Sequence, residues 1–391
     1  NITTLITAII LFIVASSTVK GFAVTLISGI LASLFSSLLV TRVCFMWLTN
    51  DGRGGLLKGV NLWSVLPDRL YHILDKRKKA AVISVCMISL SVGILAFKRG
   101  DAVSPDFAGG SMVTLRATES INLAKIDESL ADITDIPHIT QSLASPSGQD
   151  FITVRTSFSE DNGDGQTNNA QRIIDEINKD TGGELTDVQI ETVGPVIGIE
   201  LAKSSAWALG FGLVGIFFYL VFRFETSFAI GAIIALVHDI TIVLGLIVLC
   251  GEQLSLIHVG AFLTIAGYSI NDTIVVFDRI RETLKAKRGD TATIMNLAIS
   301  QTLSRTVLTS ATTLIVVVVL AIFGGPALRD FSVTLIFGVL IGTYSSLFVA
   351  SPVVLWWSGR KGGNLRREVL DAELARRIDD SGIEREAPER A

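Results

Sequence analysis

The sequence contains little charge. Asp, Glu, Lys and Arg make up 18% of its 391 residues, whereas 49% are hydrophobic. Soluble domains carry about 25% charged residues, and a mean hydropathy of +0.55 is more apolar than a water-soluble fold presents to solvent. This scarcity of charge excludes a disordered chain and argues against an ordinary cytosolic enzyme. It indicates instead that several stretches of the chain face lipid.

Cysteine is also scarce, with Cys44, Cys86 and Cys250 each lying in or beside an apolar run. Three cysteines at these spacings build neither a disulfide framework nor a metal site. We therefore expect buried, inert thiols. The sequence predicts no metal, no cofactor, no nucleic-acid partner and no enzymatic activity.

A basic leader is missing as well. Residue 1 is Asn, and 1–19 is already an apolar run with no A-x-A-like cleavage site after it. This pattern excludes a secretory signal peptide. We expect the chain to be a fragment whose natural N-terminal part precedes Asn1.

Long apolar runs are abundant. A membrane-spanning helix needs about 20 mostly apolar residues. The segment 291–303 is amphipathic and too short to span, so we expect it to form a helix at the membrane interface. The sequence predicts an α-helical polytopic membrane protein with eight transmembrane helices, at 2–19, 22–48, 80–97, 204–222, 227–250, 254–277, 306–323 and 331–357.

The charges of the connecting segments predict an orientation. The linker 49–79 holds seven Lys/Arg against three acidic residues, and 278–305 is similarly basic. The segment 98–203 holds 18 Asp/Glu and eight Lys/Arg, a net charge of −10. Since basic loops stay in the cytoplasm, we expect 49–79 inside, 98–203 outside, and both chain ends cytoplasmic. The predicted location is the inner (cytoplasmic) membrane of a bacterium.

The segment 98–203 is the only sizeable part expected to meet water. Its pattern predicts four strands and two helices in the order βαββαβ, which is the ferredoxin-like arrangement of an α+β domain. Nothing in it resembles a nucleophile–base pair. The predicted strands are 107–116, 138–144, 151–156 and 186–193, and the predicted helices are 122–133 and 169–180.

Two further segments are expected to be solvated. Residues 161–165 briefly resemble a calcium loop but lack the distal Glu ligand and the flanking helix. In the tail 358–391, the acidic and basic residues of 363–391 are nearly equal in number. This predicts a solvated or disordered cytoplasmic tail.

An internal repeat organises the membrane part. Residues 1–40 align without a gap on 310–349 at a constant offset of 309, including matched Thr, Gly and Ser residues. We therefore interpret 1–48 as the last two helices of an earlier copy of the six-helix unit at 80–357. Parallel repeats of this kind occur in transporters, with coupling sites between the copies near mid-membrane. The repeat also predicts a carboxylate before Asn1, at the position equivalent to Asp272.

Ionisable residues inside the predicted spans are the candidate functional groups, because each costs at least about 2.5 kcal/mol at a helix centre. Asp239 lies near the centre of the fifth span and Asp272 in the sixth. Arg305 begins a polar stripe on the seventh. A carboxylate that faces a basic, hydroxyl-lined helix suits a proton pathway, since it can move as the neutral acid. A structural hydrogen bond between helices is the alternative for both carboxylates.

Other polar residues are predicted to support this site or to flank it. Charged residues at the cytoplasmic end of the sixth span are expected to form an interfacial cap whose long side chains reach water. His238 has the alternative of bonding a backbone carbonyl. The supporting residues are His238, Ser269, Asn271, Thr309 and Thr313, and the cap residues are Asp278, Arg279, Arg281 and Glu282.

At these residues the sequence resembles the SecD/SecF protein-export membrane proteins of the resistance-nodulation-division superfamily. The resemblance rests most strongly on 267–282, and 1–48 resembles the end of SecD. A first-copy turn at 15–18 departs from the Gly-rich stretch usual in the family. Further matching motifs lie at 106–110, 193–201, 235–239, 301–306 and 337–352.

The resemblance implies the C-terminal part of a SecD–SecF fusion that assists the Sec translocon. Such a protein would use the proton motive force to promote late preprotein translocation. Its proton-linked pair would fall on Asp272 and Arg305. The implied partners are the SecD half, the translocon channel, other Sec auxiliary membrane subunits, the translocating preprotein and membrane lipid.

Two other functions remain open on the residues alone. One is a proton-driven small-molecule or lipid exporter of the same superfamily, although 98–203 is short for a porter cavity. The other is a membrane scaffold without ion coupling, against which the buried position predicted for Asp272 argues.

Overall fold

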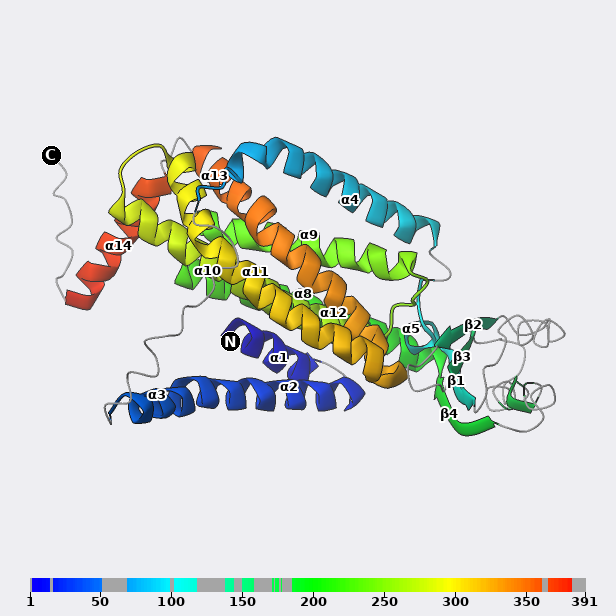
Figure 1. Cartoon of the computed structure of the whole chain (residues 1–391). Helices are drawn as coiled ribbons and strands as arrows, with labels where there is room; N and C mark the ends of the chain where they lie inside the picture. Colours follow the sequence, from blue (N-terminus) through cyan, green and yellow to red (C-terminus); the bar gives the residue numbers. More distant parts are fainter. Residues whose placement is uncertain are drawn as a thin grey trace.

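The computed structural model contains a helical bundle with a β-sheet at one end (Figure 1). The described residues are 2–14, 17–50, 69–98, 102–117, 138–143, 150–157, 171, 173–175, 177, 185–360 and 365–381. The predicted helix at 122–133, the loop at 161–165 and most of the linker 49–79 lie outside these residues.

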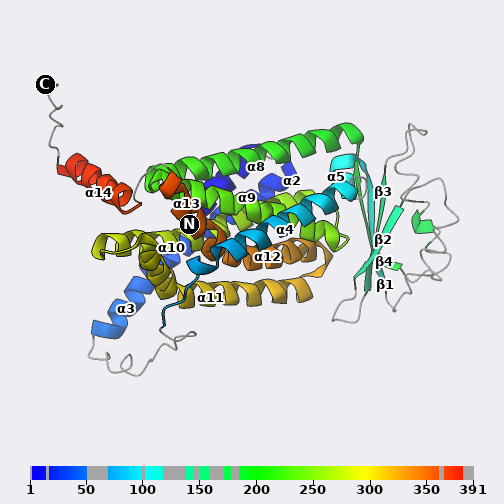
Figure 2. The same cartoon turned by 90° about the horizontal axis from the view of Figure 1, so that it is seen from above.

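The bundle helices run roughly alongside one another between the sheet and the C-terminal helix (Figure 2). The N-terminal part contains α1 (Ile2–Val14), α2 (Ser17–Phe35), η1 (Ser36–Val40) and α3 (Thr41–Asn50). The rest contains η3 (Leu74–Lys76), α4 (Arg77–Phe97), α8 (Pro195–Arg223), α9 (Thr226–Leu249), α10 (Leu256–Ala286), α11 (Thr291–Phe323), α12 (Gly325–Ser345), η4 (Ser346–Ala350), α13 (Ser351–Arg360) and α14 (Leu365–Ser381).

Seven helical stretches among the described residues are long and apolar enough to cross a membrane. They expose large apolar side chains over much of their outer surface, such as Val82 on α4, Phe218 on α8 and Ile315 on α11. Apolar residues are stable on such a surface when lipid covers it. The chain is therefore a membrane protein. The seven stretches are Ala23–Leu48, Leu74–Phe97, Val196–Arg223, Thr226–Leu249, Leu256–Ala286, Thr291–Phe323 and Leu328–Arg360.

The first predicted span is shorter than expected. In place of a helix over 2–19, α1 ends at Val14, and the apolar stretch Ile2–Ile13 falls below the length that crosses a bilayer.

The segment 291–303, expected to form a short helix of its own, is instead the first part of a longer helix. Residues 291–323 form the single helix α11. No Gly or Pro interrupts this stretch, so the intrahelical hydrogen bonds continue through it. The apolar residues of its amphipathic half, Met295, Ala298 and Ile299, are fully buried in the protein core, so that half packs on protein.

The prediction of a wholly solvated tail was also wrong. Residues Leu365–Ser381 form α14, in which Leu365 and Val369 are buried and belong to the main hydrophobic core. These two residues lie four apart, on one face of the helix.

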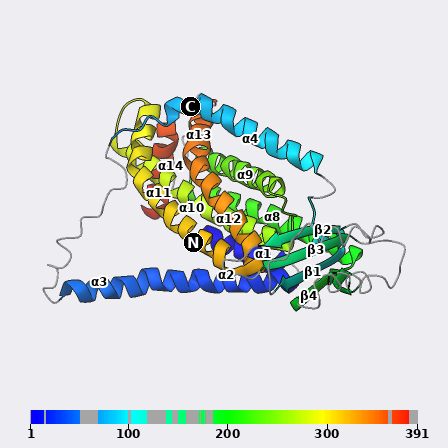
Figure 3. The same ribbon diagram turned by 45° about the vertical axis from the view of Figure 1, so that its right-hand side comes forward.

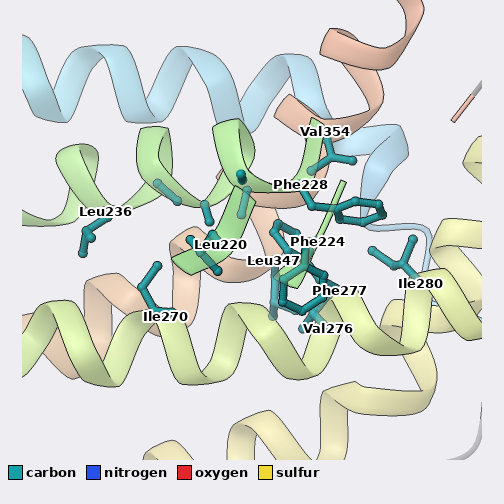
Figure 4. Packing of buried hydrophobic residues seen from close by; sticks show 14 of the residues in the cluster. Leu220, Phe224, Phe228, Leu236, Ile270, Val276, Phe277, Ile280, Leu347 and Val354 are labelled. Carbon is teal, nitrogen blue, oxygen red and sulfur yellow. The ribbon is translucent and has the colours of Figure 1, made fainter. Parts of the chain in front are cut away.

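The core of the bundle surrounds α9 and α10. Their apolar stretches are the most buried of the seven candidate membrane spans. Figure 4 shows aromatic side chains gathered where α8 meets these two helices. Phe228 packs edge-on against Phe277 with ring centroids 5.0 Å apart, and Phe224 lies 6.3 Å from both. This cluster fixes the end of the bundle that lies away from the sheet.

Small residues let the helices approach closely. A Cβ added at Gly245 of α9 would lie 2.3 Å from Cβ of Ser91 on α4, and one at Gly338 of α12 would lie 2.3 Å from Ile265 on α10. Helix contacts within membranes depend on such close van der Waals packing, because lipid provides no hydrophobic drive for association.

The repeat seen in the sequence recurs in the helices. A five-residue π-helix interrupts both copies, at Ser36–Val40 and at Ser346–Ala350. The flanking α2 and α3, of 19 and 10 residues, correspond in order to α12 and α13, of 21 and 10 residues. Figure 3 shows α2 and α3 extending along one side of the bundle.

The four strands β1 (Gly110–Ala117), β2 (His138–Leu143), β3 (Asp150–Ser157) and β4 (Leu185–Val193) form one antiparallel sheet in the order β2-β3-β1-β4. The first strand starts later than predicted. Residues Pro105–Ala108 form the short helix α5, and Gly109 with φ of 82° then turns the chain into β1.

The cysteine prediction was wrong in one respect: all three thiol residues are exposed. Cys86, for example, shares the outer surface of α4 with Val82 and Val85. On a membrane helix the apolar outside is a suitable place for such a residue, because its neighbour there is lipid.

Candidate functional site

A carboxylate is buried at the centre of α9. Asp239 has no exposed surface, and its Oδ2 accepts hydrogen bonds from Ser269 of α10 at 2.6 Å and Ser345 of α12 at 2.7 Å. Its Oδ1 lies 2.9 Å from Nδ1 of His238. Three helices thus supply the polar contacts that a buried carboxylate requires.

His238 extends this cluster to α4. Its Nε2 lies 3.1 Å from the Ser84 hydroxyl, and that hydroxyl lies 3.2 Å from Oη of Tyr344. Tyr344 in turn donates to the carbonyl oxygen of Ala80 at 3.1 Å. We call these five residues, Asp239, His238, Ser84, Tyr344 and Ala80, the Asp239 hydrogen-bond network.

A second carboxylate lies on α10, where Asp272 is 5% exposed. Thr309 and Ser310 of α11 donate to its two oxygens at 3.4 and 3.3 Å. Thr343 of α12 donates to the Ser310 hydroxyl at 2.7 Å, and Tyr268 approaches the same hydroxyl at 3.5 Å. Hydroxyl groups from three helices therefore line this site.

The structure brings together only part of the predicted polar stripe on α11. Arg305 lies on the exposed side of α11, one turn before Thr309, whose hydroxyl contacts Asp272. Thr313 instead bonds the backbone carbonyl of Thr309, and Asn271 is exposed. Of the predicted stripe, Thr309 thus contacts Asp272 and Arg305 lies one turn away, whereas Thr313 bonds its own helix and Asn271 is exposed.

The predicted interfacial cap contains one buried member. Arg281 is 5% exposed and Glu225 of the α8–α9 turn is 7% exposed. Nη2 and Nε of the arginine lie 2.9 and 3.1 Å from the same Oε1 atom, and the guanidinium lies 5.2 Å from the ring centroid of Phe224. The expectation that Arg281 reaches water was wrong, because this arginine pairs with a glutamate inside the protein.

The other residues of the predicted cap, Asp278, Arg279 and Glu282, have exposed side chains. Arg279 contacts Glu282 at 2.5 Å and donates to Gln301 at 2.8 Å. Asp278 is about half exposed and lies 3.8 Å from Arg223 and 3.7 Å from Arg281. Exposed pairs of this kind contribute little stability.

The C-terminal helix α14 packs against this end of the bundle. Glu368 accepts hydrogen bonds from the backbone N–H and the hydroxyl of Ser227, at 3.2 and 2.7 Å, in the first turn of α9. Glu373 pairs with Lys285 of α10. An acidic group at a helix N-terminus is favourable, because it satisfies an unbonded N–H and opposes the helix dipole.

Sequence reasoning missed several contacts of both carboxylates. Ser84, Ser345, Tyr344 and Thr343 are common residues in membrane helices, and none stands out without its partner. One signal was available for Ser345, since the repeat matches it to Ser36. Within the described part of the chain, no group of three His, Cys, Asp or Glu residues could hold a metal ion.

Comparison with known proteins agrees with this architecture. Residues 173–360 match the family described as protein export membrane protein SecD/SecF, C-terminal. The chain is 38% identical to the protein translocase subunit SecF of Desulfurispirillum indicum over 298 residues. This alignment covers 75% of the chain and 94% of the relative. The chain belongs to the SecD/SecF family.

Fused relatives match over more of the chain. The protein translocase subunit SecDF of Thermus thermophilus is 36% identical over 369 residues, 92% of this chain and 48% of the relative. A crystal structure described as SecDF, a translocon-associated membrane protein, matches with a TM-score of 0.77 at 34% identity, and covers 92% of this chain and 47% of that one. The chain thus spans about half the length of the SecDF relatives it matches.

Proposed function

We propose that the chain is an auxiliary component of the Sec protein-export machinery, with no catalysed reaction of its own. In this role it uses the proton motive force to promote late preprotein translocation across the cytoplasmic membrane. The observation that carries this proposal is the match to translocase subunits SecF over nearly their whole length. The SecD half, the translocon channel, other Sec auxiliary subunits and the preprotein are the proposed partners, within a lipid membrane.

The proposed orientation places the β-sheet outside a bacterial inner membrane and the basic segments inside. Its support is the net charge of −10 over 98–203 against the basic segments 49–79 and 278–305. The sheet and α14 also lie at opposite ends of the bundle (Figure 1). We propose 98–203 as the periplasmic domain and 358–391 as a cytoplasmic segment.

The proposed domain organisation keeps two unequal halves. Residues 1–48 would supply the first two of the eight transmembrane helices, which are the last two helices of the SecD-like half, and the linker 49–79 follows them. Residues 80–97 and 204–357 would supply the other six. A ferredoxin-like fold for 98–203 is supported by the strand order β2-β3-β1-β4 and by its antiparallel pairing.

Asp272, Arg305 and Asp239 are the proposed proton-coupling residues. Asp272 is buried among hydroxyl groups that can bond either its neutral or its ionised form. Arg305 lies one turn from Thr309 on α11, and its positive charge would favour the ionised form. His238, Ser269 and Thr309 contact a carboxylate directly and are the proposed supporting residues.

The experiment is the substitution Asp272→Asn in the gene that encodes the chain, with Asp278→Asn as the control. Asp278 lies on the same helix and is about half exposed, so it tests loss of a carboxylate outside the site. In inverted membrane vesicles, we expect Asp272→Asn to abolish the stimulation of preprotein translocation by a proton gradient. We expect Asp278→Asn to retain it, with both variants inserted normally. Full stimulation in Asp272→Asn vesicles would refute the role of this residue.

A further inference from the structure

The Asp239 hydrogen-bond network connects a fully buried carboxylate, that of Asp239, with a half-buried phenol, that of Tyr344. Asp239 has 0%, His238 3% and Ser84 7% of its surface exposed, whereas Tyr344 is half-buried. This hydrogen-bond chain ends at Ala80, directly after the exposed residues 77–79 that begin α4. A polar path therefore leads from the middle of α9 to the N-terminal turn of α4.

The direction of each hydrogen bond follows from its last link. A backbone carbonyl only accepts, so the single proton of the Tyr344 hydroxyl points to Ala80. Tyr344 must then accept from Ser84, and Ser84, having used its only proton, must accept from His238. Nε2 of His238 therefore carries a proton.

This direction leaves one proton between His238 and Asp239. With Nε2 protonated, a neutral imidazole has a bare Nδ1 that accepts from the protonated carboxyl of Asp239. Transfer of that proton gives an imidazolium beside a carboxylate. The pair has zero net charge in both states, so neither state leaves an uncompensated charge in the interior.

We propose that Ser84 and Tyr344 extend the Asp239–His238 pair into a proton relay that ends at the cytoplasmic end of α4. This inference rests on the proton-coupled function proposed above. In one passage, Asp239 releases its proton to Nδ1 and Nε2 releases one to Ser84. Ser84 then releases its own to Tyr344, and the Tyr344 hydroxyl turns from the Ala80 carbonyl and releases its proton to water. Each intermediate group gains one proton and loses another, so only Asp239 changes its charge. Its carboxylate then accepts hydrogen bonds from Nδ1 of His238, Ser269 and Ser345, which stabilise the buried charge.

A purely structural role would use the same contacts to hold α4 against α9 and α12. Tyr344→Phe separates the two roles, because it removes the hydroxyl and keeps the ring, which stacks on Phe348 at 5.3 Å. Tyr219→Phe is the matched control, since Tyr219 is a half-buried tyrosine on α8, outside both carboxylate clusters. Ser84→Ala interrupts the same relay one step earlier.

The first measurement is gradient-stimulated translocation in inverted membrane vesicles. We expect Tyr344→Phe and Ser84→Ala each to lower the stimulation at least tenfold, at normal membrane abundance. The double variant should be no worse than either single one, because both interrupt one series of steps. Full stimulation in Tyr344→Phe vesicles would overturn the relay. If Asp272→Asn vesicles lose stimulation in the same experiment, the proposed function stands without it, and if they also keep it, both proposals fail.

The second measurement is independent of translocation. In ¹⁵N-histidine-labelled protein, the His238 signals, identified by their loss in His238→Gln, should show a protonated Nε2. In Tyr344→Phe the Ser84 hydroxyl becomes free to donate to Nε2, so the tautomer protonated at Nδ1 should increase, whereas Tyr219→Phe should leave the signals unchanged. An Nε2 without a proton in the unmodified protein would overturn the deduced direction of these hydrogen bonds.

Discussion

The buried pair Arg281–Glu225 should be the ion pair on which the stability of the bundle depends most. The two side chains are only 6% and 3% exposed. Arg281→Met keeps much of the side-chain volume but removes both nitrogen contacts to Oε1 and the contact with the Phe224 ring. Glu225 would then be a buried charge without its partner. Removing one member of such a pair costs about 3–5 kcal/mol, or a factor of roughly 10² to 10⁴ in the unfolding equilibrium.

The measurement is unfolding of the purified chain in mixed detergent micelles, followed by circular dichroism. Glu225→Gln combined with Arg281→Met removes both charges, so we expect the double variant to recover most of the loss. Arg367→Met is the matched control, because Arg367 pairs with Asp371 at 3.7 Å while both side chains are more than 70% exposed. It should change stability little. Equal losses for Arg281→Met and Arg367→Met, or no recovery in the double variant, would refute the reasoning.

Two further predictions concern helix packing. Gly245→Ala should destabilise the protein by about 1–3 kcal/mol in the same unfolding measurement, because the new Cβ would lie 2.3 Å from Cβ of Ser91. The control is Gly93→Ala, whose Cβ would have nothing within 4 Å and which should be neutral or slightly stabilising. Equal effects would contradict the close contact. Glu368→Ala should cost about 1 kcal/mol and speed proteolysis within α14, since it removes both bonds to Ser227. Unchanged proteolysis would show that α14 does not depend on this cap.

The sequence predicts the hydrophobic spans and the buried carboxylates well, because both follow from the cost of polar groups in lipid. Asp272 stands out within an apolar run, and Thr309 can be placed near it from helical spacing. The partners of Asp239 cannot be found this way. Ser84, for example, lies 154 residues from His238 along the chain, and only packing of α4 on α9 brings them together.

The wrong predictions share a physical origin. A charged residue near the end of a span looks solvated, but Arg281 is covered because its partner Glu225 lies in a turn 56 residues away. The charge-balanced tail likewise looks solvated, although Leu365 and Val369 of α14 are buried. In both cases the local composition reflects mainly the exposed residues of the segment. The tertiary contact that buries its other residues comes from a distant part of the chain, so the local composition does not reveal it.

The helix α10 connects the separate polar sites of the protein. Near its N-terminus, the backbone N–H of Leu256 donates to Asp106 in α5, next to the sheet. At its middle, Ser269 contacts Asp239 and Asp272 contacts α11, and near its C-terminus Arg281 is held by Glu225. With 31 residues it is roughly 46 Å long, more than the 30 Å or so of membrane hydrocarbon. Because one continuous helix makes all these contacts, a shift of α10 along its axis changes both carboxylate clusters and the attachment of the sheet together.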